Sequence, residues 1–504
     1  MRIVWLIPGS GESFYCENCL RDYAMLGALR ALGHNVLMVP MYLPLLPEGE
    51  LGEPRPEGSG AGAAKTPPSG PIRAGLGGAT GLAGAAPLFF GGVNVYLRQK
   101  WAVFGHMPEW LRGWLDRPGL LKVAGRMSGM VNASDLKQTL VSMLRGEEGR
   151  QAKELERLTD YLATAGADVV VLSNALLLGL ARRIKARLKV PVACYLQDED
   201  EFIDALDDAG RREVWSIVRE RGSDVDLFIA ASRYYADKMS GALCDAGILP
   251  ACVAGVSPAS SQFLDVSSLE QQQKQQRKDA GETPATHQGK MPMPRIEVVY
   301  AGIAMSEYGP PHRDWPDPPV IGFLSRRCYS KGPDLLAEAF CRLKANGRLS
   351  RLKLRLAGGM LADDKPLERQ IRRRLARAGV LGDVEFLPHM ELPRRAEFLR
   401  GLSVLSVPQR VGEAGGRYVK EALACGVPVV QPENGVFPEL IAATGGGLLF
   451  PPGDVDALTQ QLTRILTEPQ LAKSLATHGR AAVAELFSAR RSAEQLESLL
   501  LSLR

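Results

Sequence analysis

The stretch "RVGEAGGRYVKEALACGVPVVQPENG", residues 410–435, decides the fold that this sequence predicts. The preceding "LSVLSVPQR" is apolar and strand-like, "RYVKEALA" has the spacing of a short helix, and "VPVV" begins a second strand. Gly426 stands where a helix commonly ends in a glycine. A strand, a glycine-rich loop, a helix and another strand in this order predict one parallel β–α–β unit.

Two glycines and two carboxylates in this unit indicate a ligand site. Gly415 and Gly416 precede the helix, where backbone N–H groups and the helix dipole favour a phosphate. Phosphate would repel Glu413 and Glu421, but carboxylates accept strong hydrogen bonds from sugar hydroxyls. A nucleotide sugar carries hydroxyls on both sides of its diphosphate. The alternative is that Glu421 pairs with Arg417, four residues earlier, and that Glu413 is a solvated loop residue.

The loop after an earlier strand carries three basic side chains. In "IGFLSRRCYSKGPDLLAEAF", a strand is followed by Arg326, Arg327 and Lys331 and then by a helix. Arginine offers phosphate a planar fork, and lysine offers a flexible point charge. Ligands of parallel sheets bind at the carboxyl ends of the strands, where both loops are expected. The two loops together therefore predict a site for a diphosphate.

Strand-like and helix-like segments alternate along most of the chain, regularly from residue 318 onward and less regularly before it. This pattern predicts an α/β protein with two Rossmann-like, doubly wound parallel-sheet domains that face a cleft. We expect an N-terminal domain over residues 1–300 and a C-terminal, nucleotide-sugar-binding domain over residues 301–485. A last helix over residues 486–504 is expected to cross back to the first domain.

Three segments interrupt the alternation in the first half. Residues 47–87 are rich in Gly, Pro and Ala, and residues 265–294 are polar and rich in Gln and Lys. Neither buries enough apolar surface to offset the entropy of ordering, so both are expected to be flexible insertions. Residues 97–165 have helical spacing and predict a helical insertion. It packs on its own domain in the simplest interpretation; a lid over the cleft or a surface that touches membrane are the alternatives.

The composition bounds the class of protein and its partners. The 504 residues exceed one core, and the net charge of +5 is small. No stretch reaches about 18 uncharged apolar residues, so no membrane span is expected. The eight scattered cysteines favour reduced thiols in the cytoplasm. The basic run "IRRRLARAG" is most simply the solvated face of a helix, so nucleic-acid binding is not expected. A peripheral contact with the inner face of a membrane stays open.

The C-terminal half resembles a known enzyme family. "EAGGRYVKEALACGVPVV" is similar to the family pattern of Glu, seven residues and Glu, followed by "G-x-P-V-V". "RRCYSKG" and "LRLAGG" resemble two further signatures. The family is that of the retaining glycosyltransferases with the GT-B fold (glycosyltransferase family 4, glycosyl transferases group 1). The resemblance covers about residues 296–485, while the N-terminal half matches only loosely, through "LRALGHNV" and its strand order.

The resemblance implies a role for each matching position. Arg326 and Lys331 would bind the donor diphosphate, and Glu413 would bind the hydroxyls of the transferred sugar. Glu421 would hold the ribose hydroxyls. Glu413, Arg326 and Lys331 form the implied catalytic set. The implied donor site comprises Ser325, Arg326, Lys331, His389, Glu413, Ala414, Gly415, Gly416 and Glu421. No metal or other cofactor is implied, because the fold and the charges around the diphosphate would stabilise the leaving group.

Two positions of the donor site depart from the family pattern. Ser325 stands where the family usually has a glycine, and Gly415 stands where it usually has an aromatic residue. A wider sugar pocket follows, so the resemblance does not indicate which sugar is transferred.

The acceptor side of the cleft is expected in the N-terminal domain. "QDEDEFID" stands where many relatives have a histidine, and its Asp198 and Glu199 are candidates for acceptor contacts. The alternatives are a metal site, which the acidic run resembles only weakly, and capping of the next helix. Gly11 and Glu12, in the loop "PGSGESFY" after the first strand, are further acceptor-side candidates.

The sequence therefore predicts a glycosyltransferase that moves a sugar from a nucleotide-sugar donor to an acceptor hydroxyl with retention of configuration. The acceptor is expected to be a carbohydrate or a lipid-linked molecule. A nucleotide-sugar 2-epimerase and a non-catalytic nucleotide-sugar-binding protein are the alternatives. An epimerase turns over without an acceptor, and a binding protein releases no nucleotide with any acceptor.

Overall fold

A computed structural model describes residues 1–8, 17–41, 133–243, 295–309, 315–390 and 392–504. The predicted insertions 47–87 and 265–294 lie outside these ranges, as do residues 97–132 of the predicted helical insertion. Gly11 and Glu12 also lie outside them.

The N-terminal domain is built on a six-stranded parallel sheet with the order β2-β1-β3-β4-β5-β6. Its strands are short apolar runs, and β3 is buried along its whole length, as expected for a sheet covered on both faces. The strands are β1 (Arg2–Ile7), β2 (Asn35–Pro40), β3 (Val169–Leu172), β4 (Val192–Leu196), β5 (Leu227–Ala230) and β6 (Ile296–Val298). The helices are α1 (Glu17–Ala31), α5 (Ala133–Leu144), α6 (Ala152–Ala165), α7 (Ala181–Leu188), α8 (Glu199–Asp204), α9 (Asp208–Gly222) and α10 (Arg233–Leu243), with 3-10 turns η4 (Gly146–Glu148) and η5 (Ala175–Leu180).

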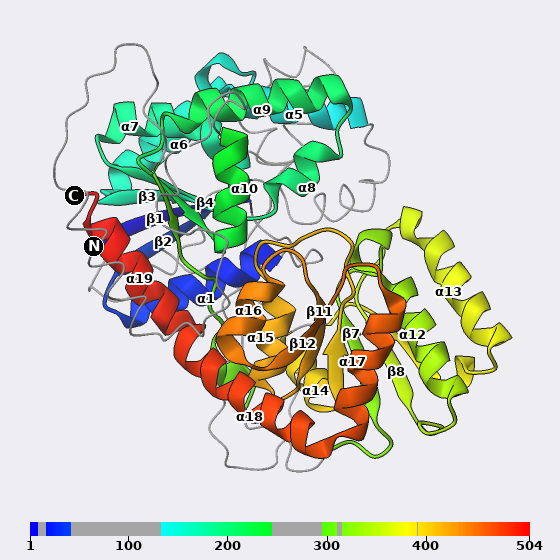
Figure 1. The fold of residues 1–504 in the computed structure, drawn as a ribbon. Coiled ribbons are helices and arrows are strands. Elements are labelled where there is room, and N and C mark those ends of the chain that lie inside the picture. The colour runs from blue at the N-terminus through cyan, green and yellow to red at the C-terminus, as the bar shows by residue number, and fades with distance from the viewer. Residues whose placement is uncertain (9–16, 42–132, 244–294, 310–314, 391) are drawn as a thin grey trace, which may run out of the picture.

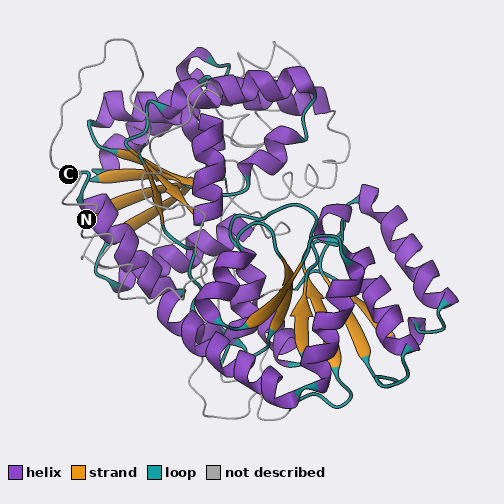
Figure 2. Ribbon diagram, viewed as in Figure 1, coloured by secondary structure: helices purple, strands orange, loops and turns teal. Residues whose placement is uncertain are grey.

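The C-terminal domain contains a second six-stranded parallel sheet, with the order β12-β11-β10-β7-β8-β9. Its strands are β7 (Val320–Leu324), β8 (Lys353–Ala357), β9 (Val384–Leu387), β10 (Val404–Ser406), β11 (Val429–Pro432) and β12 (Gly447–Phe450). Its helices are α12 (Pro333–Ala345), α13 (Lys365–Arg377), α14 (Leu392–Arg400), α15 (Arg417–Ala424), α16 (Phe437–Thr444), α17 (Val455–Thr467) and α18 (Pro469–Leu486). The 3-10 turns are η6 (Met305–Glu307), η7 (Tyr329–Lys331), η8 (Ala362–Asp364) and η9 (Leu381–Asp383). Helices lie on both faces of each sheet (Figure 2), so the predicted fold class is confirmed.

The last helix, α19 (Ala489–Leu501), lies against the N-terminal domain. Figure 1 shows it in red beside α1, with both marked ends of the chain close together. Its Ala493, Leu496 and Leu500 are buried in one cluster with Trp5 of β1 and Leu29 of α1. The N-terminal domain therefore takes part of its core from the end of the described chain.

Two further observations concern the helices. The part of the predicted helical insertion that is described, α5 and α6, packs into the core of its own domain through leucines such as Leu140, Leu144, Leu155 and Leu158. None of the helices in the described ranges is long and apolar enough to cross a membrane.

Candidate functional site

The C-terminal sheet reverses its strand order between β7 and β10. From β7 the sheet continues through β8 and β9, and from β10 it continues the other way through β11 and β12. Ligands of doubly wound sheets bind outside the carboxyl ends of the strands at such a switch point. Lys331 follows β7 and Glu413 follows β10. The two loops predicted from the sequence therefore flank the switch point.

A glycine lets these two loops touch. Gly332 has a φ of +69°, and a Cβ there would lie 2.1 Å from the carbonyl oxygen of Pro408, so only glycine fits. Lys331 is thereby held against the loop after β10. Its Nζ donates to Glu413 Oε2 at 2.9 Å and to Gln409 Oε1 at 3.2 Å. Sequence reasoning missed Gln409, although it directly follows the proline that ends a strand-like run.

The second oxygen of Glu413 accepts a hydrogen bond from the helix that follows. The backbone N–H of Gly416 donates to Glu413 Oε1 at 3.0 Å. Gly416 is the N-cap residue of α15, with a φ of +57°, and a Cβ there would lie 2.7 Å from Leu440 Cδ1. Glu413 is only 3% exposed, so the alternative that it is a solvated loop residue is wrong. In this structure the carboxylate itself occupies the helix N-terminus that the sequence predicted for a phosphate.

The N-terminal domain reaches this loop through Asp198. Its Oδ1 accepts a hydrogen bond from the backbone N–H of Ala414 at 2.8 Å. Asp198 has a φ of +58°, which a non-glycine residue rarely adopts, and it makes no side-chain cap on α8. The capping alternative is therefore wrong for Asp198. Burial, and after it the nearby Glu413 carboxylate, raise the pKa of Asp198 well above its ordinary value. Glu201 lies 3.8 Å from Lys331 Nζ on the same side.

A second N-terminal side chain lies where the family's aromatic residue is missing. Gln197 Nε2 is 3.3 Å from the position that a Cβ at Gly415 would take. The other amide atom of Gln197, Oε1, accepts a hydrogen bond from Arg21 Nη1 at 2.9 Å. The Arg21 guanidinium is itself buried over the ring of Tyr195, 4.4 Å from its centroid. The absence of a side chain at Gly415 is thus matched by a fixed amide from the other domain.

Glu439 makes another contact between the domains that the sequence did not indicate. Its carboxylate accepts hydrogen bonds from the backbone N–H groups of Arg233, at 3.1 Å, and Tyr234, at 2.6 Å, at the start of α10. It also accepts one from the hydroxyl of Tyr300, at 2.5 Å, between the two domains. A carboxylate at a helix N-terminus is favoured by the helix dipole. No local pattern marks Glu439, because its partners on α10 lie about two hundred residues away in the chain.

Glu199 does not face the cleft, contrary to the acceptor-side prediction. It is 3% exposed and accepts hydrogen bonds from the backbone N–H of Ala175 at 2.9 Å and of Gln197 at 2.7 Å. The hydroxyl of Tyr235 donates to it at 2.8 Å. Burial raises its pKa, and these hydrogen bonds oppose the rise. Glu199 therefore holds together three segments of the N-terminal domain.

Glu421 is also placed differently from the prediction. It is fully buried, and its Oε1 accepts from Arg417 Nε at 2.8 Å and from the Tyr308 hydroxyl at 3.0 Å. Its Oε2 accepts from Arg395 Nη2. Burial opposes the charged form, but Arg395 and Arg417 outweigh it, so the pKa of Glu421 lies below its ordinary value. The alternative of an Arg417–Glu421 pair is correct, and the ribose role of Glu421 does not fit this arrangement.

The remaining donor candidates lie around the loop after β7. Arg326 is half-exposed and donates through Nε and Nη2 to the carboxylate of Asp364, at 3.0 and 3.3 Å. Ser325 is partly buried, and its carbonyl oxygen would lie 1.8 Å from a Cβ at Gly358. His389 is exposed, two residues beyond the edge strand β9. Arg326 and Lys331 thus share one loop, but Arg326 pairs with Asp364 and Lys331 with Glu413.

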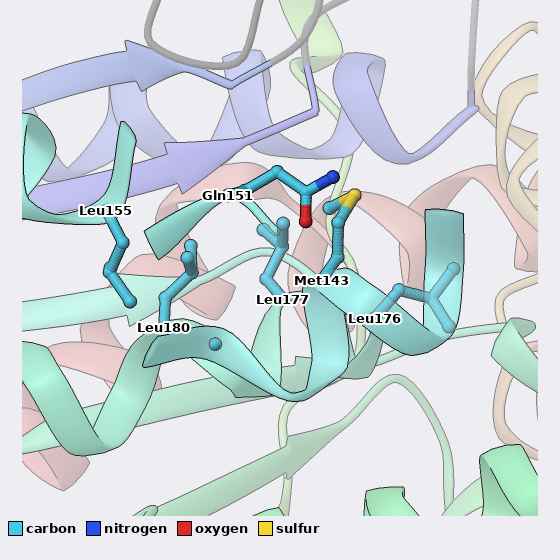
Figure 3. Close-up of a pocket in the computed structure, with 7 residues that line it drawn as sticks. Met143, Gln151, Leu155, Leu176, Leu177 and Leu180 are labelled. Atoms are coloured by element: carbon cyan, nitrogen blue, oxygen red, sulfur yellow. The ribbon is translucent and has the colours of Figure 1, made fainter. Parts of the chain in front are cut away.

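Within the described residues, neither metal ligation nor a cavity of the N-terminal domain gives a rival site for a sugar. In those ranges, no group of three or more His, Cys, Asp or Glu side chains could hold a metal ion; metal independence itself stays a prediction. A cavity in the N-terminal domain is lined mainly by leucines, with Met143 and Gln151 (Figure 3). It leaves about 10 Å³ for the centre of a water molecule. That is room for about one water, and a sugar is far larger.

Parts of the chain match known proteins. Residues 310–482 match the model of the family described as "Glycosyl transferases group 1". The GDP-mannose-dependent alpha-(1-6)-phosphatidylinositol monomannoside mannosyltransferase of Mycolicibacterium smegmatis is 32% identical over 201 residues, which are 36% of this chain and 50% of that protein. The D-inositol 3-phosphate glycosyltransferase of Jonesia denitrificans is 28% identical over 194 residues, 36% of this chain and 45% of that protein. The chain spans about half the length of the curated relatives it matches.

Solved structures resemble the whole two-domain arrangement. Sucrose-phosphate synthase from Thermosynechococcus elongatus superimposes with a TM-score of 0.58 at 18% identity, covering 100% of this chain and 98% of that one. HepE of Anabaena in complex with UDP gives a TM-score of 0.52 at 16% identity, covering 71% of this chain and 84% of that one. At such identities the likeness shows the fold alone, which is GT-B. The chain thus has the GT-B fold, and residues 310–482 of its C-terminal domain are similar to the glycosyl transferases group 1.

Proposed function

We propose that the protein is a cytoplasmic glycosyltransferase that moves a sugar from a nucleotide-sugar donor to an acceptor hydroxyl with retention of configuration. The observation that carries this proposal is the Lys331–Glu413 pair at the switch point of the C-terminal sheet, beside the N-terminus of α15. The match of residues 310–482 to the model of the glycosyl transferases group 1 supports it.

Donor binding would exchange the partners of this pair. The ammonium of Lys331 would turn from Glu413 to the diphosphate, which carries more negative charge than one carboxylate. Glu413 would release the N–H of Gly416 to the diphosphate and accept hydrogen bonds from hydroxyls of the sugar. Lys331 and Glu413, which are in contact in this structure, would thus separate. Lys331 would bind the diphosphate and Glu413 the sugar, on either side of the bond that breaks.

The transfer breaks the bond between the anomeric carbon and the diphosphate oxygen and forms one between that carbon and the acceptor oxygen. The electron pair of the broken bond stays on the diphosphate, where Lys331 and the backbone N–H groups of Gly415 and Gly416 would stabilise it. The acceptor proton passes to the departing phosphate oxygen. With acceptor and leaving group on the same face of the sugar, configuration is retained.

The relatives suggest a range of donors and acceptors. The name of the mycobacterial relative specifies GDP-mannose and a phosphatidylinositol monomannoside, and HepE was solved with UDP. For this chain we propose a nucleoside diphosphate sugar as donor and a carbohydrate or lipid-linked molecule as acceptor.

A thermal-shift screen against nucleotide sugars tests the proposal. A ligand that binds only the folded state stabilises it by about 2.7 kcal/mol at a hundred times its Kd. We expect at least one nucleotide sugar to raise the Tm, and we expect Lys331→Ala to lose that rise. A screen in which no nucleotide sugar and no nucleoside diphosphate shifts the Tm would refute the donor site. Nucleotide release that requires an added acceptor would distinguish a transferase from an epimerase.

A further inference from the structure

Helix α13 carries a row of basic side chains on its surface. Its sequence, "KPLERQIRRRLAR", contains six basic residues and one acidic residue. Lys365, Arg369, Arg373 and Arg377 follow each other at intervals of four residues, about one helical turn. All four are exposed. They therefore form a basic row along the outside of the helix.

Within the described residues, the other arginines of α13 pair with carboxylates, whereas the side chains of the row have no such partner. Arg372 pairs with Glu368 at 2.8 Å and lies over the ring of Phe386. Arg374 pairs with Glu338 of α12. Among the described residues, none makes a hydrogen bond or an ion pair with a side chain of the row. Like charges four residues apart destabilise a helix, so the row costs stability that nothing in the described fold returns.

The row borders a groove between α12 and α13. Arg369, Arg373 and Arg377 line it together with Arg374 and Cys341, and its volume is about 850 Å³. Guanidinium groups on a concave, open surface are suited to phosphate groups, which they bind through paired N–H donors. The groove could thus bind several phosphate groups at once.

The start of the row lies at the same edge of the C-terminal sheet as the candidate site. Because α13 connects the parallel strands β8 and β9, its first turn lies at the carboxyl edge of the sheet. Asp364, just before α13, pairs with Arg326 of the loop after β7. Figure 1 shows α13 on the outer edge of the C-terminal domain. Leu361, three residues before Asp364, is a large apolar side chain with 47% of its surface exposed.

We propose that α13 docks the protein on an anionic phospholipid surface, with the basic row on the headgroups and Leu361 in the interface. Basic side chains next to an exposed apolar one fit a lipid surface, which offers both phosphates and hydrocarbon. A nucleic acid offers phosphates but no hydrocarbon layer in which Leu361 could be buried. The docking would bring the carboxyl edge of the C-terminal sheet toward the membrane, and it holds whether or not the proposed transfer activity is correct.

Vesicle co-sedimentation of the full chain tests this proposal. The protein should sediment with phosphatidylcholine vesicles that contain phosphatidylglycerol, and much less with phosphatidylcholine alone or at high salt. A basic residue near an anionic membrane contributes about fivefold to partitioning. The triple variant R369E/R373E/R377E should therefore lose at least about tenfold. R369Q/R373Q/R377Q should lose less, and it serves as the readout if the reversal variant fails to fold.

The matched control reverses three exposed arginines elsewhere, R348E/R351E/R490E, with the same change in net charge. It should bind vesicles within about threefold of the unmodified protein, since these side chains lie outside α13. Equal losses in both triple variants would overturn the proposal, because net charge alone would then explain them. So would equal binding by the α13 variants and the unmodified protein, or binding to duplex DNA but not to vesicles.

Discussion

Glu413 and Glu421 belong to one motif, eight residues apart, yet their surroundings in the structure are opposite in kind. Glu413 lies in a loop, held by a lysine from a neighbouring loop and by one backbone N–H, under the edge of the other domain. Glu421 lies inside a helix, fully buried, and two guanidinium groups and a phenol hydroxyl hold it within one domain.

The difference lies in how readily each arrangement can be remade. An ammonium on a flexible stem, as at Glu413, can exchange one anion for another with small rearrangement. Two buried planar guanidinium groups around Glu421 cannot leave it without an uncompensated buried charge. We infer that Glu413 binds the ligand and that Glu421 stabilises the fold of the C-terminal domain. Four predictions follow this division from the largest expected effect to the smallest.

Loss of the buried carboxylate should destabilise the protein most. Glu421→Ala leaves Arg395 and Arg417 without their counter-charge, and breaking such a buried pair costs about 3–5 kcal/mol. Urea unfolding of the variant measures this loss. Glu397→Ala, an exposed carboxylate on α14, should stay within about 0.5 kcal/mol of the unmodified protein. If the variant kept its stability but lost nucleotide binding, the role of Glu421 would be to bind the ribose, as the resemblance implies.

Loss of the loop carboxylate should instead affect binding of the sugar. Glu413→Gln removes charged hydrogen bonds worth about 1.5–3 kcal/mol, so the nucleotide sugar should bind roughly 10- to 100-fold more weakly. The nucleoside diphosphate alone should keep its affinity within about threefold, because Lys331 is still present. Titration calorimetry with both ligands measures the two values. An equal loss for both would mean that Glu413 does not contact the sugar.

The two adjacent glycines should respond unequally to a methyl group. Gly416→Ala forces alanine into a left-handed conformation and against Leu440, at a cost of about 1–3 kcal/mol. Gly415→Ala meets only the end of the Gln197 side chain at 3.3 Å, so its cost should stay below about 1 kcal/mol. Thermal unfolding of both variants ranks them. The reverse order would show that Gln197 cannot yield.

The two regions should also depend on pH with opposite sign. The pKa of Asp198 is raised in the folded state, so its contribution to stability is full below its unfolded value of about 3.9 and is lost as the pH rises through the folded-state value. The pKa of Glu421 is lowered, so its contribution is present above about 4.3 and is lost as the pH falls.

Asp198→Asn should therefore gain stability relative to the unmodified protein as the pH rises above about 4. The asparagine oxygen can still accept the hydrogen bond of the Ala414 N–H, without the charge. Unfolding in urea at several pH values measures the difference, with the exposed Asp237→Asn as the control. A difference that does not change with pH would contradict the raised pKa of Asp198.

Local patterns predicted the two sheets and placed Lys331 and Glu413 together, because both follow strands whose carboxyl ends share one edge. The same patterns could not predict the partners of Asp198 or Glu439, which come from the other domain. They also placed Glu421 on the ligand, although the pair with Arg417 was one of the alternatives. The deciding residue was Arg395, which lies on a different helix and carries no periodic signal. Spacing along the chain reveals which edge a residue occupies, but not which distant side chain meets it there.

The position of α19 has a consequence for synthesis on the ribosome. Ala493, Leu496 and Leu500 cover one face of a sheet whose first strand is made some five hundred residues earlier. That face stays open to water, and to chaperones, until α19 has emerged. Among the described residues, the core around the C-terminal sheet is built from the segment between Ile303 and Phe487, so it can close before α19 has emerged. We expect the domain made last to be the one that finishes folding first.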